Sequence, residues 1–154
     1  MKADLDKKDL SILRILQKKG RIAISELAEK INLSDTPCLR RIRNLEKSGV
    51  ITGYGAQLNP QSVGLDVLVY AAVKLAESSD VYAQGFECAI LEFNEVIECS
   101  IVSGAHDYIL KIVASDLHSY EVFVKKSLGS LKYVSSIEST IVLKQTLIRR
   151  DLPL

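Results

Sequence analysis

Several polar side chains recur at helical spacing between residues 34 and 49. At about 100° per residue, four of them fall within a sector of about 60°. A guanidinium group can donate two hydrogen bonds to a guanine edge or to phosphate, and a threonine hydroxyl can bond to either. The pattern therefore indicates a surface for duplex DNA, although helix surfaces often carry solvated charges with no such role. The four residues are Thr36, Arg40, Arg43 and Lys47.

A second polar group lies in the short connection formed by residues 103–107. Gly104 permits close approach of another backbone, and the Asp107 carboxylate could bind an ammonium group. The alternative is a tight hairpin in which Asp107 hydrogen-bonds its own turn and His106 is an ordinary turn residue. The residues alone leave both interpretations open.

Charge and aromatic content divide the chain near residue 59. Residues 1–59 hold twelve Lys and Arg against seven acids, a net charge of +5, whereas residues 60–154 carry −4. A basic first part is suited to a polyanion. Of the nine Phe and Tyr residues, only Tyr54 precedes residue 60, so the basic part lacks the aromatic platforms on which single-stranded bases stack. Duplex DNA is the better match.

Three short helices are predicted in the first sixty residues. Asp6 can cap a helix whose leucines and isoleucines continue to about Lys18, where two lysines and a glycine favour its end. Ser25 can cap a second helix that ends at Asn32. Ser34 can cap a third, which stops at Gly49. Residues 50–58 are β-prone and predict a short wing or strand before a domain boundary at about residue 60.

The second part repeats one pattern of strand and helix. Apolar runs predict strands at 66–74, 96–102, 108–114 and 134–143. An amphipathic helix capped by Ser79 or Asp80 follows the first strand, and another, capped near Ser115 or Asp116, follows the third. The order βαββαβ predicts a four-stranded antiparallel sheet with both helices on one face. We expect the other face to pair with a second subunit. The predicted fold class is α+β, with an N-terminal winged helix-turn-helix at 1–60 (helix-turn-helix motif about 24–43) and a C-terminal ferredoxin-like sandwich at 61–154.

Two separate motifs resemble the Lrp/AsnC family of leucine-responsive and asparagine-type transcriptional regulators. They lie in residues 33–54 and 102–108, and the resemblance covers essentially the whole chain. It implies a DNA-binding first domain and an amino-acid-sensing second domain that dimerises and often assembles into an octamer. The residues expected at DNA on this basis are Ser34, Thr36, Pro37, Arg40, Arg41, Arg43 and Lys47.

The same resemblance implies a site for a small effector, usually an amino acid, between dimers near the glycine loop. The loop matches the family residue by residue, and the last strand matches it more loosely. The expected effector residues are Gly104, Ala105, His106, Asp107, Tyr108, Ser136, Ser139, Thr140 and Ile141.

The resulting hypothesis is a cytoplasmic transcriptional regulator that binds double-stranded DNA as a dimer-based oligomer and responds to an amino acid. The alternative is an architectural protein that wraps DNA and has no effector. An enzyme is not expected, because no pair of nucleophile and base is visible. No cofactor or metal is expected either, since Cys38, Cys88 and Cys99 form no CxxC pair and do not cluster with histidine. We expect buried or half-buried free thiols. Residues 1–6 lack the apolar core of a secretory signal, and no apolar run is long enough for a membrane span.

Overall fold

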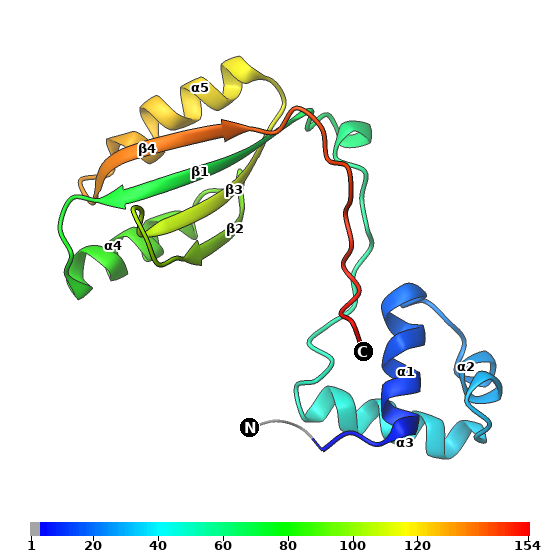
Figure 1. The fold of residues 1–154 in the computed structure, drawn as a ribbon. Helices are drawn as coiled ribbons and strands as arrows, with labels where there is room; N and C mark the ends of the chain where they lie inside the picture. The colour runs from blue at the N-terminus through cyan, green and yellow to red at the C-terminus, as the bar shows by residue number, and fades with distance from the viewer. Residues whose placement is uncertain (1–3) are drawn as a thin grey trace. The chain divides into compact units, whose positions relative to one another are not determined.

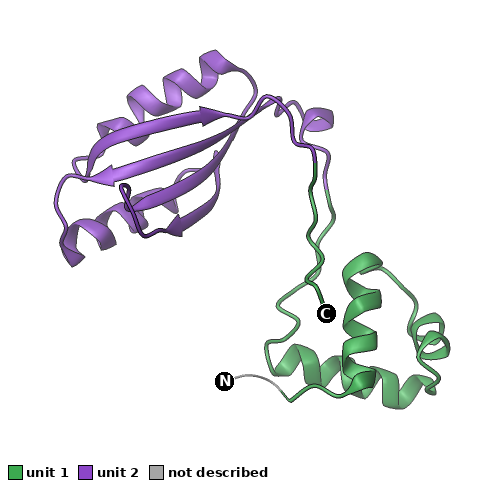
Figure 2. Ribbon diagram, viewed as in Figure 1, with its two compact units in different colours: residues 1–57, 147–154 green, residues 58–146 purple. Residues whose placement is uncertain are grey.

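The computed structural model describes residues 4–154, so residues 1–3, part of the segment considered for a secretory signal, lie outside the described residues. The chain forms two compact units (Figure 2). One runs to residue 57 and also contains residues 147–154, and the other comprises residues 58–146. The sequence pattern did not predict that residues 147–154 return to the first unit.

Three helices make up most of the first unit: α1 Lys7–Lys18, α2 Ile24–Lys30 and α3 Asp35–Lys47 (Figure 1). The predicted cap of α1 is confirmed, because the Asp6 carboxylate accepts from the main-chain N–H of Asp9 at 2.8 Å. The Asp9 carboxylate accepts in turn from the Asp6 N–H at 3.2 Å, which completes a capping box.

The starts of α2 and α3 differ in detail from the prediction. Helix α2 begins two residues earlier than predicted, with Ala23 at the N-cap, so the predicted cap by Ser25 is wrong. Ser34 does occupy the N-cap of α3, but its side chain makes no capping hydrogen bond. Asn32 adopts a left-handed conformation with φ of 51°, which turns the chain between the two helices.

Gly49 ends α3 as predicted, with φ of 73°, a conformation that suits glycine. The strand expected within residues 50–58 is absent from the described structure, and almost all of these residues are exposed. The strand alternative of that prediction was wrong, because β propensity forms a strand only where a partner strand supplies the hydrogen bonds. The three helices pack around a core of Ile12, Leu13, Leu27, Ala28, Ile31, Cys38, Ile42 and Leu45.

The second unit is a four-stranded antiparallel sheet with strand order β2-β3-β1-β4. Short 3-10 turns at Gln61–Val63 and Leu128–Ser130 precede β1 and β4. The predicted βαββαβ order is confirmed, with Ser79 and Asp116 at the two helix N-caps. The elements are β1 Val67–Leu75, α4 Asp80–Ile90, β2 Val96–Ile101, β3 Tyr108–Ala114, α5 Leu117–Lys126 and β4 Val134–Ile141.

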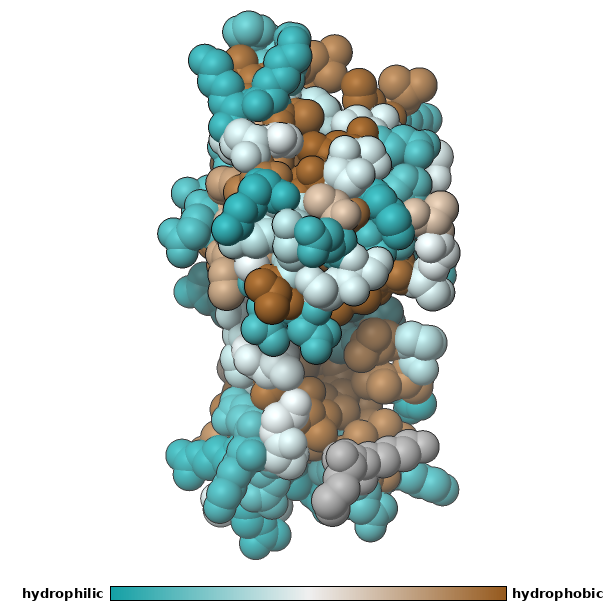
Figure 3. Space-filling model, turned by 90° about the vertical axis from the view of Figure 1, so that its left-hand side faces the viewer, coloured by the Kyte–Doolittle hydropathy of each residue, from teal (hydrophilic) through white to brown (hydrophobic). Residues whose placement is uncertain are grey.

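Both helices cover one face of this sheet (Figure 1). Alternate residues of β1, such as Val69, Ala71 and Val73, are fully buried against Phe86 of α4 and Phe123 of α5. The residues between them point to the open face, where apolar side chains stay exposed. Figure 3 shows that apolar side chains reach the surface in several places among polar ones. Tyr70 and Ile109, which belong to the open face, are each 39% exposed.

The cysteines differ partly from the expectation. Cys38 is buried in the first unit, whereas Cys88 and Cys99 are exposed, and all three are free thiols. Within residues 4–154, no helix combines the length and the apolar composition that crossing a bilayer requires.

Candidate functional sites

The polar stripe on α3 faces solvent, as its spacing predicted. Thr36, Arg40, Arg43 and Lys47 are all exposed. The opposite side of the helix carries Cys38, Ile42 and Leu45, which are 0%, 5% and 4% exposed. Burial of that side fixes the rotation of α3 about its axis, so the four polar tips share one outward surface.

The charges of this stripe are free of internal partners. No carboxylate among the described residues lies within ion-pair distance of Arg40, Arg43 or Lys47. Ser34 lies exposed at the start of the helix, and Pro37 is half-buried in its first turn, where a missing N–H costs nothing. An outward face with two unpaired guanidinium groups can bond to phosphates or to base edges.

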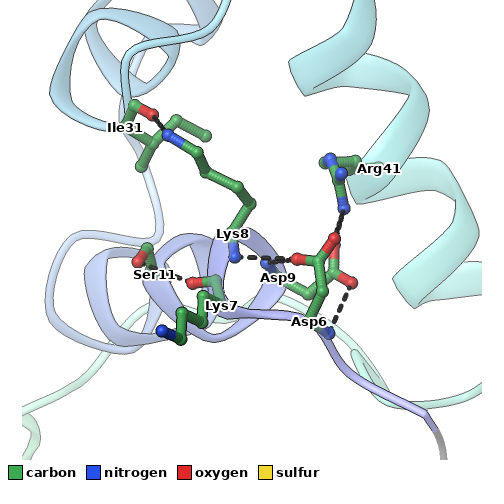
Figure 4. A network of polar contacts seen from close by, with 7 residues as sticks. All are labelled: Asp6, Lys7, Lys8, Asp9, Ser11, Ile31 and Arg41. Carbon is green, nitrogen blue, oxygen red and sulfur yellow. Dashed lines mark hydrogen bonds and ion pairs between the residues drawn. The ribbon is translucent and has the colours of Figure 1, made fainter.

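Arg41, which was expected at DNA, has ion-pair partners within its own unit. Its Nη1 donates to Asp6 at 2.6 Å and to Asp9 at 2.8 Å, both at the start of α1 (Figure 4). The hydrogen bond to Asp9, followed by the one to Asp6, raises the pKa of Arg41. The Asp9 N–H, assisted by Arg41, lowers the pKa of the Asp6 carboxyl. Arg41 thus joins α3 to α1, and because these ion pairs engage its guanidinium group, we leave it out of the DNA contacts proposed below.

Two further contacts hold neighbouring segments to this framework. The Lys8 ammonium donates to the main-chain oxygen of Ile31, just beyond α2 (Figure 4). The Tyr54 hydroxyl donates to Glu46 of α3 at 3.0 Å. Lys8 of α1 thus bonds to the end of α2, and Tyr54, which follows α3 in the sequence, bonds to the end of α3.

In the other unit, the connection between β2 and β3 is anchored to β1. The Asp107 carboxylate accepts from the Leu75 N–H at 2.8 Å and from the Lys74 ammonium at 3.1 Å. These two donors, Leu75 first, lower the pKa of Asp107. The main-chain N–H of Asp107 also donates to Val73 at 2.9 Å, and Gly104 takes a φ of 129°. The Asp107 carboxylate thus bonds to the end of a neighbouring strand, while the Asp107 main-chain oxygen accepts from the Val102 N–H at 3.0 Å and closes its own turn.

Part of β4 lies near this loop. His106 Nε2 is 3.4 Å from a carboxylate oxygen of Glu138 on β4. Ser136 lies directly opposite Lys74 in the register between β1 and β4. Lys74 and Glu138 were not singled out in the sequence, because only strand register brings them to the loop.

The expected β4 residues divide between the two faces of the sheet. Ser136 and Thr140 share the open face, since Thr140 lies opposite the exposed Tyr70. Ser139 and Ile141 belong to the helix-covered face, and the Ser139 hydroxyl is 2.5 Å from that of Tyr120 on α5. Sequence spacing could not separate these pairs without the strand's orientation.

A hollow of about 450 Å³ lies between α4 and the end of the β2–β3 connection. Tyr108 is 2% exposed, and its hydroxyl donates to Glu87 of α4 at 2.7 Å. Burial, followed by Glu87, raises the pKa of this phenol. The lining of the hollow contains carboxylates, hydroxyls and an amide but no lysine or arginine. Its polar residues are Ser78, Ser79, Asp80, Gln84, Glu87, Asp107 and Tyr108.

Comparison with protein families matches both units in order. A model for winged helix-turn-helix DNA-binding domains matches residues 5–52, and a model for the Lrp/AsnC ligand binding domain matches residues 68–152. The chain belongs to the Lrp/AsnC family of transcriptional regulators. This family consists of regulators and not of enzymes. The Lrp/AsnC protein described here therefore has a DNA-binding unit, which contains α3, and a ligand-binding unit, which contains the sheet.

Individual relatives of this Lrp/AsnC protein agree along nearly the whole length. A leucine-responsive regulatory protein of Rhizobium meliloti is 38% identical over 94% of this chain and 93% of its own. The Bkd operon transcriptional regulator of Pseudomonas aeruginosa is 37% identical over 99% of each chain. A transcriptional regulator of Neisseria meningitidis, crystallised as a complex with L-Met, superposes with a TM-score of 0.94 at 34% identity over 97% of each chain.

Proposed function

We propose that this Lrp/AsnC regulator acts in the cytoplasm, binds duplex DNA sequence-specifically through the outward face of α3, and is controlled by a small effector, an amino acid. The observation that carries the DNA part is the exposed stripe on α3. Arg40 and Arg43 are placed to contact guanine edges or phosphates, and Lys47 a phosphate. The proposed contact residues are Ser34, Thr36, Pro37, Arg40, Arg43 and Lys47.

The open face of the sheet supports a dimer as the unit that binds DNA. Tyr70 and Ile109 lie exposed on this face, and a second copy would remove their apolar surface from water. Dimerisation would present two α3 helices to successive major grooves, about 34 Å apart. We propose that such dimers assemble further into an octamer.

The effector site that we propose is the β2–β3 loop with the adjoining part of β4. Asp107 accepts two hydrogen bonds already, but a carboxylate has about four lone-pair sites and can accept a further ammonium proton. The residues of the loop and strand proposed to surround the effector are Gly104, Ala105, His106, Asp107, Tyr108, Ser136, Ser139, Thr140 and Ile141. Support for an amino acid comes from the L-Met complex of the Neisseria regulator, a relative similar over the whole chain.

The DNA proposal is tested by selecting bound sequences from a random duplex pool and titrating the best ones between 50 and 200 mM salt. We expect an enriched sequence and an affinity that falls steeply with salt, because phosphate neutralisation releases counterions. Binding that ignores both sequence and salt would refute the proposal. The effector part is tested by calorimetry with each of the twenty amino acids. Absence of heat and of any change in assembly for all twenty would favour the architectural DNA-wrapping alternative.

A further inference from the structure

The segment formed by residues 147–154, which we call the C-terminal clip, is bound to helix α1. Gln17 bonds to the main chain of Leu152 in both directions: its Oε1 accepts from the Leu152 N–H at 2.6 Å, and its Nε2 lies 3.3 Å from the Leu152 carbonyl oxygen. One turn earlier on α1, Arg14 Nε donates to the main-chain oxygen of Leu154 at 2.9 Å. Residues three apart share one face of a helix, so both side chains hold the clip along a single line.

The Gln17 side-chain amide satisfies both main-chain groups of Leu152, as a neighbouring β-strand would do with its main chain. The clip has no regular secondary structure, so its main-chain groups need partners from elsewhere. A glutamine amide offers one donor and one acceptor, the same pair that a neighbouring strand would offer. The contacts that hold the clip on α1 are made to its main chain and not to its side chains. The side chains of Leu147, Ile148 and Leu152 accordingly remain 66%, 62% and 68% exposed.

The clip gives the DNA-binding unit a second covalent connection. The chain leaves this unit after residue 57 and returns to it at residue 147. Residues 142–146 are all that separate the clip from the end of β4, a span of at most about 18 Å when fully extended. The Val142 N–H, which donates to Leu68 at 2.9 Å, still continues the pairing of β4 with β1.

The same helix is joined to α3. Asp6 and Asp9 at the start of α1 both bond to Arg41 of α3, and the cores of the two helices are shared. The chain itself joins β4 to the clip through residues 142–146, and side-chain contacts then join the clip to α1 and α1 to α3. Helices that share a dense core move together, so a contact that restricts the position of α1 also restricts the position of α3.

We propose that the C-terminal clip is an integral part of the DNA-binding unit, and that its docking on Arg14 and Gln17 restrains α3 and thereby strengthens DNA binding. The docking of the clip is independent of the proposed function, whereas its effect on DNA affinity rests on that function. A restrained unit loses less freedom when it binds, which favours binding without any new contact to DNA.

The first test measures docking alone, by hydrogen exchange of the full-length protein followed at the peptide that contains Leu152. In Gln17→Ala we expect exchange of the Leu152 amide to rise at least tenfold, because its acceptor is removed. Ser11→Ala is the matched control on the same helix, since the Ser11 hydroxyl donates within α1 to Lys7. Equal exchange in Gln17→Ala and wild type would overturn the docking.

The second test measures DNA affinity over a salt series. For Gln17→Ala, and for a chain ending at residue 146, we expect a three- to tenfold loss with an unchanged salt slope, because the clip neutralises no phosphate. Unchanged affinity alongside faster Leu152 exchange would overturn the restraint but not the docking. If the wild type fails to bind DNA, the proposed function fails while the exchange result still decides the docking.

A third measurement identifies the chain that supplies the clip. Protection of Leu152 that is independent of protein concentration supports docking within one chain. Protection that disappears when the oligomer is diluted to monomer would place the clip on a second copy and overturn the second connection within the chain.

Discussion

The α3 stripe and the effector site are built in opposite ways. The stripe comes from one continuous helix, where a repeat of three and four residues suffices to align Thr36, Arg40, Arg43 and Lys47. The proposed effector site combines the β2–β3 loop, the end of β1 and part of β4, which are distant in sequence and meet through strand register. Each substitution on the α3 stripe should therefore lower DNA affinity by its own separate amount. A single substitution in a site formed by strand register should instead lower effector affinity by disturbing the whole site.

The largest effect is expected for Arg40→Ala combined with Arg43→Ala. Each good arginine contact contributes about 1–3 kcal/mol, so the double variant should lose at least about thirtyfold in affinity for its selected site. Mobility-shift titration measures this loss. Lys125→Ala, which removes an exposed cation from α5, is the control and should bind normally. Equal DNA affinity of the double variant and the wild type would contradict the claim that the α3 stripe binds DNA through its individual side chains.

The next largest effect is expected for Asp107→Asn, which keeps the shape of the side chain and removes its charge. The Lys74 ammonium loses its partner, and any effector ammonium loses its counter-ion. For an amino acid that binds the wild type, calorimetry should show at least a tenfold loss of affinity. DNA affinity without effector should stay within about twofold. Asp66→Asn, the same change at an exposed position of the ligand-binding unit, should leave both unchanged.

A smaller effect is expected for Arg41→Gln, because its ion pairs are partly exposed. The variant should unfold at a lower urea concentration than the wild type at pH 7, and the decrease should be small because solvent screens the pairs. The folded-state pKa of Asp6 lies below its usual 3.8, so this stabilisation is present above about pH 4 and is lost as the pH falls through the lowered value. The difference between variant and wild type should accordingly shrink at pH 3. A difference that persists undiminished there would argue against the ion pairs as its source.

The smallest effect is expected for Tyr120→Phe, which removes the hydroxyl next to Ser139 on the helix-covered face of β4. Loss of one hydrogen bond should lower the free energy of unfolding by about 0.5–1 kcal/mol. Because Tyr120 lies on the opposite face from Ser136 and Thr140, effector affinity should change less than in Asp107→Asn. If Tyr120→Phe instead abolished effector binding, the site would depend mainly on its helix-covered part around Ser139 and not on the loop that carries Asp107.

The features that could be predicted from the sequence are those that depend on residues close together in the chain, as the α3 stripe does. Helix α3, its end at Gly49 and its stripe depend on local spacing and capping, and the structure has them where the pattern placed them. The order of strands and helices was also predictable, because alternating and helical apolar patterns are local signals. These local features account for the order of the helices and strands and for the α3 stripe.

The contacts that were not predictable join residues far apart in sequence. Arg41 has the same side chain as Arg40, and only the packing of α1 against α3 brings it to Asp6 and Asp9. Lys74 reaches Asp107 because β1 lies beside β3. The return of residues 147–154 to α1 depends on main-chain groups, which leave no trace in residue type.

The most direct test of the central claim, that the outward face of α3 binds duplex DNA, is a hydroxyl-radical footprint on the selected sequence. For the wild type we predict protected backbone segments spaced by whole helical turns, about 10 base pairs or a multiple of that number. The same footprint should be missing for the Arg40→Ala, Arg43→Ala variant at protein concentrations that saturate wild-type binding. An unchanged pattern of protection in that variant would contradict the account.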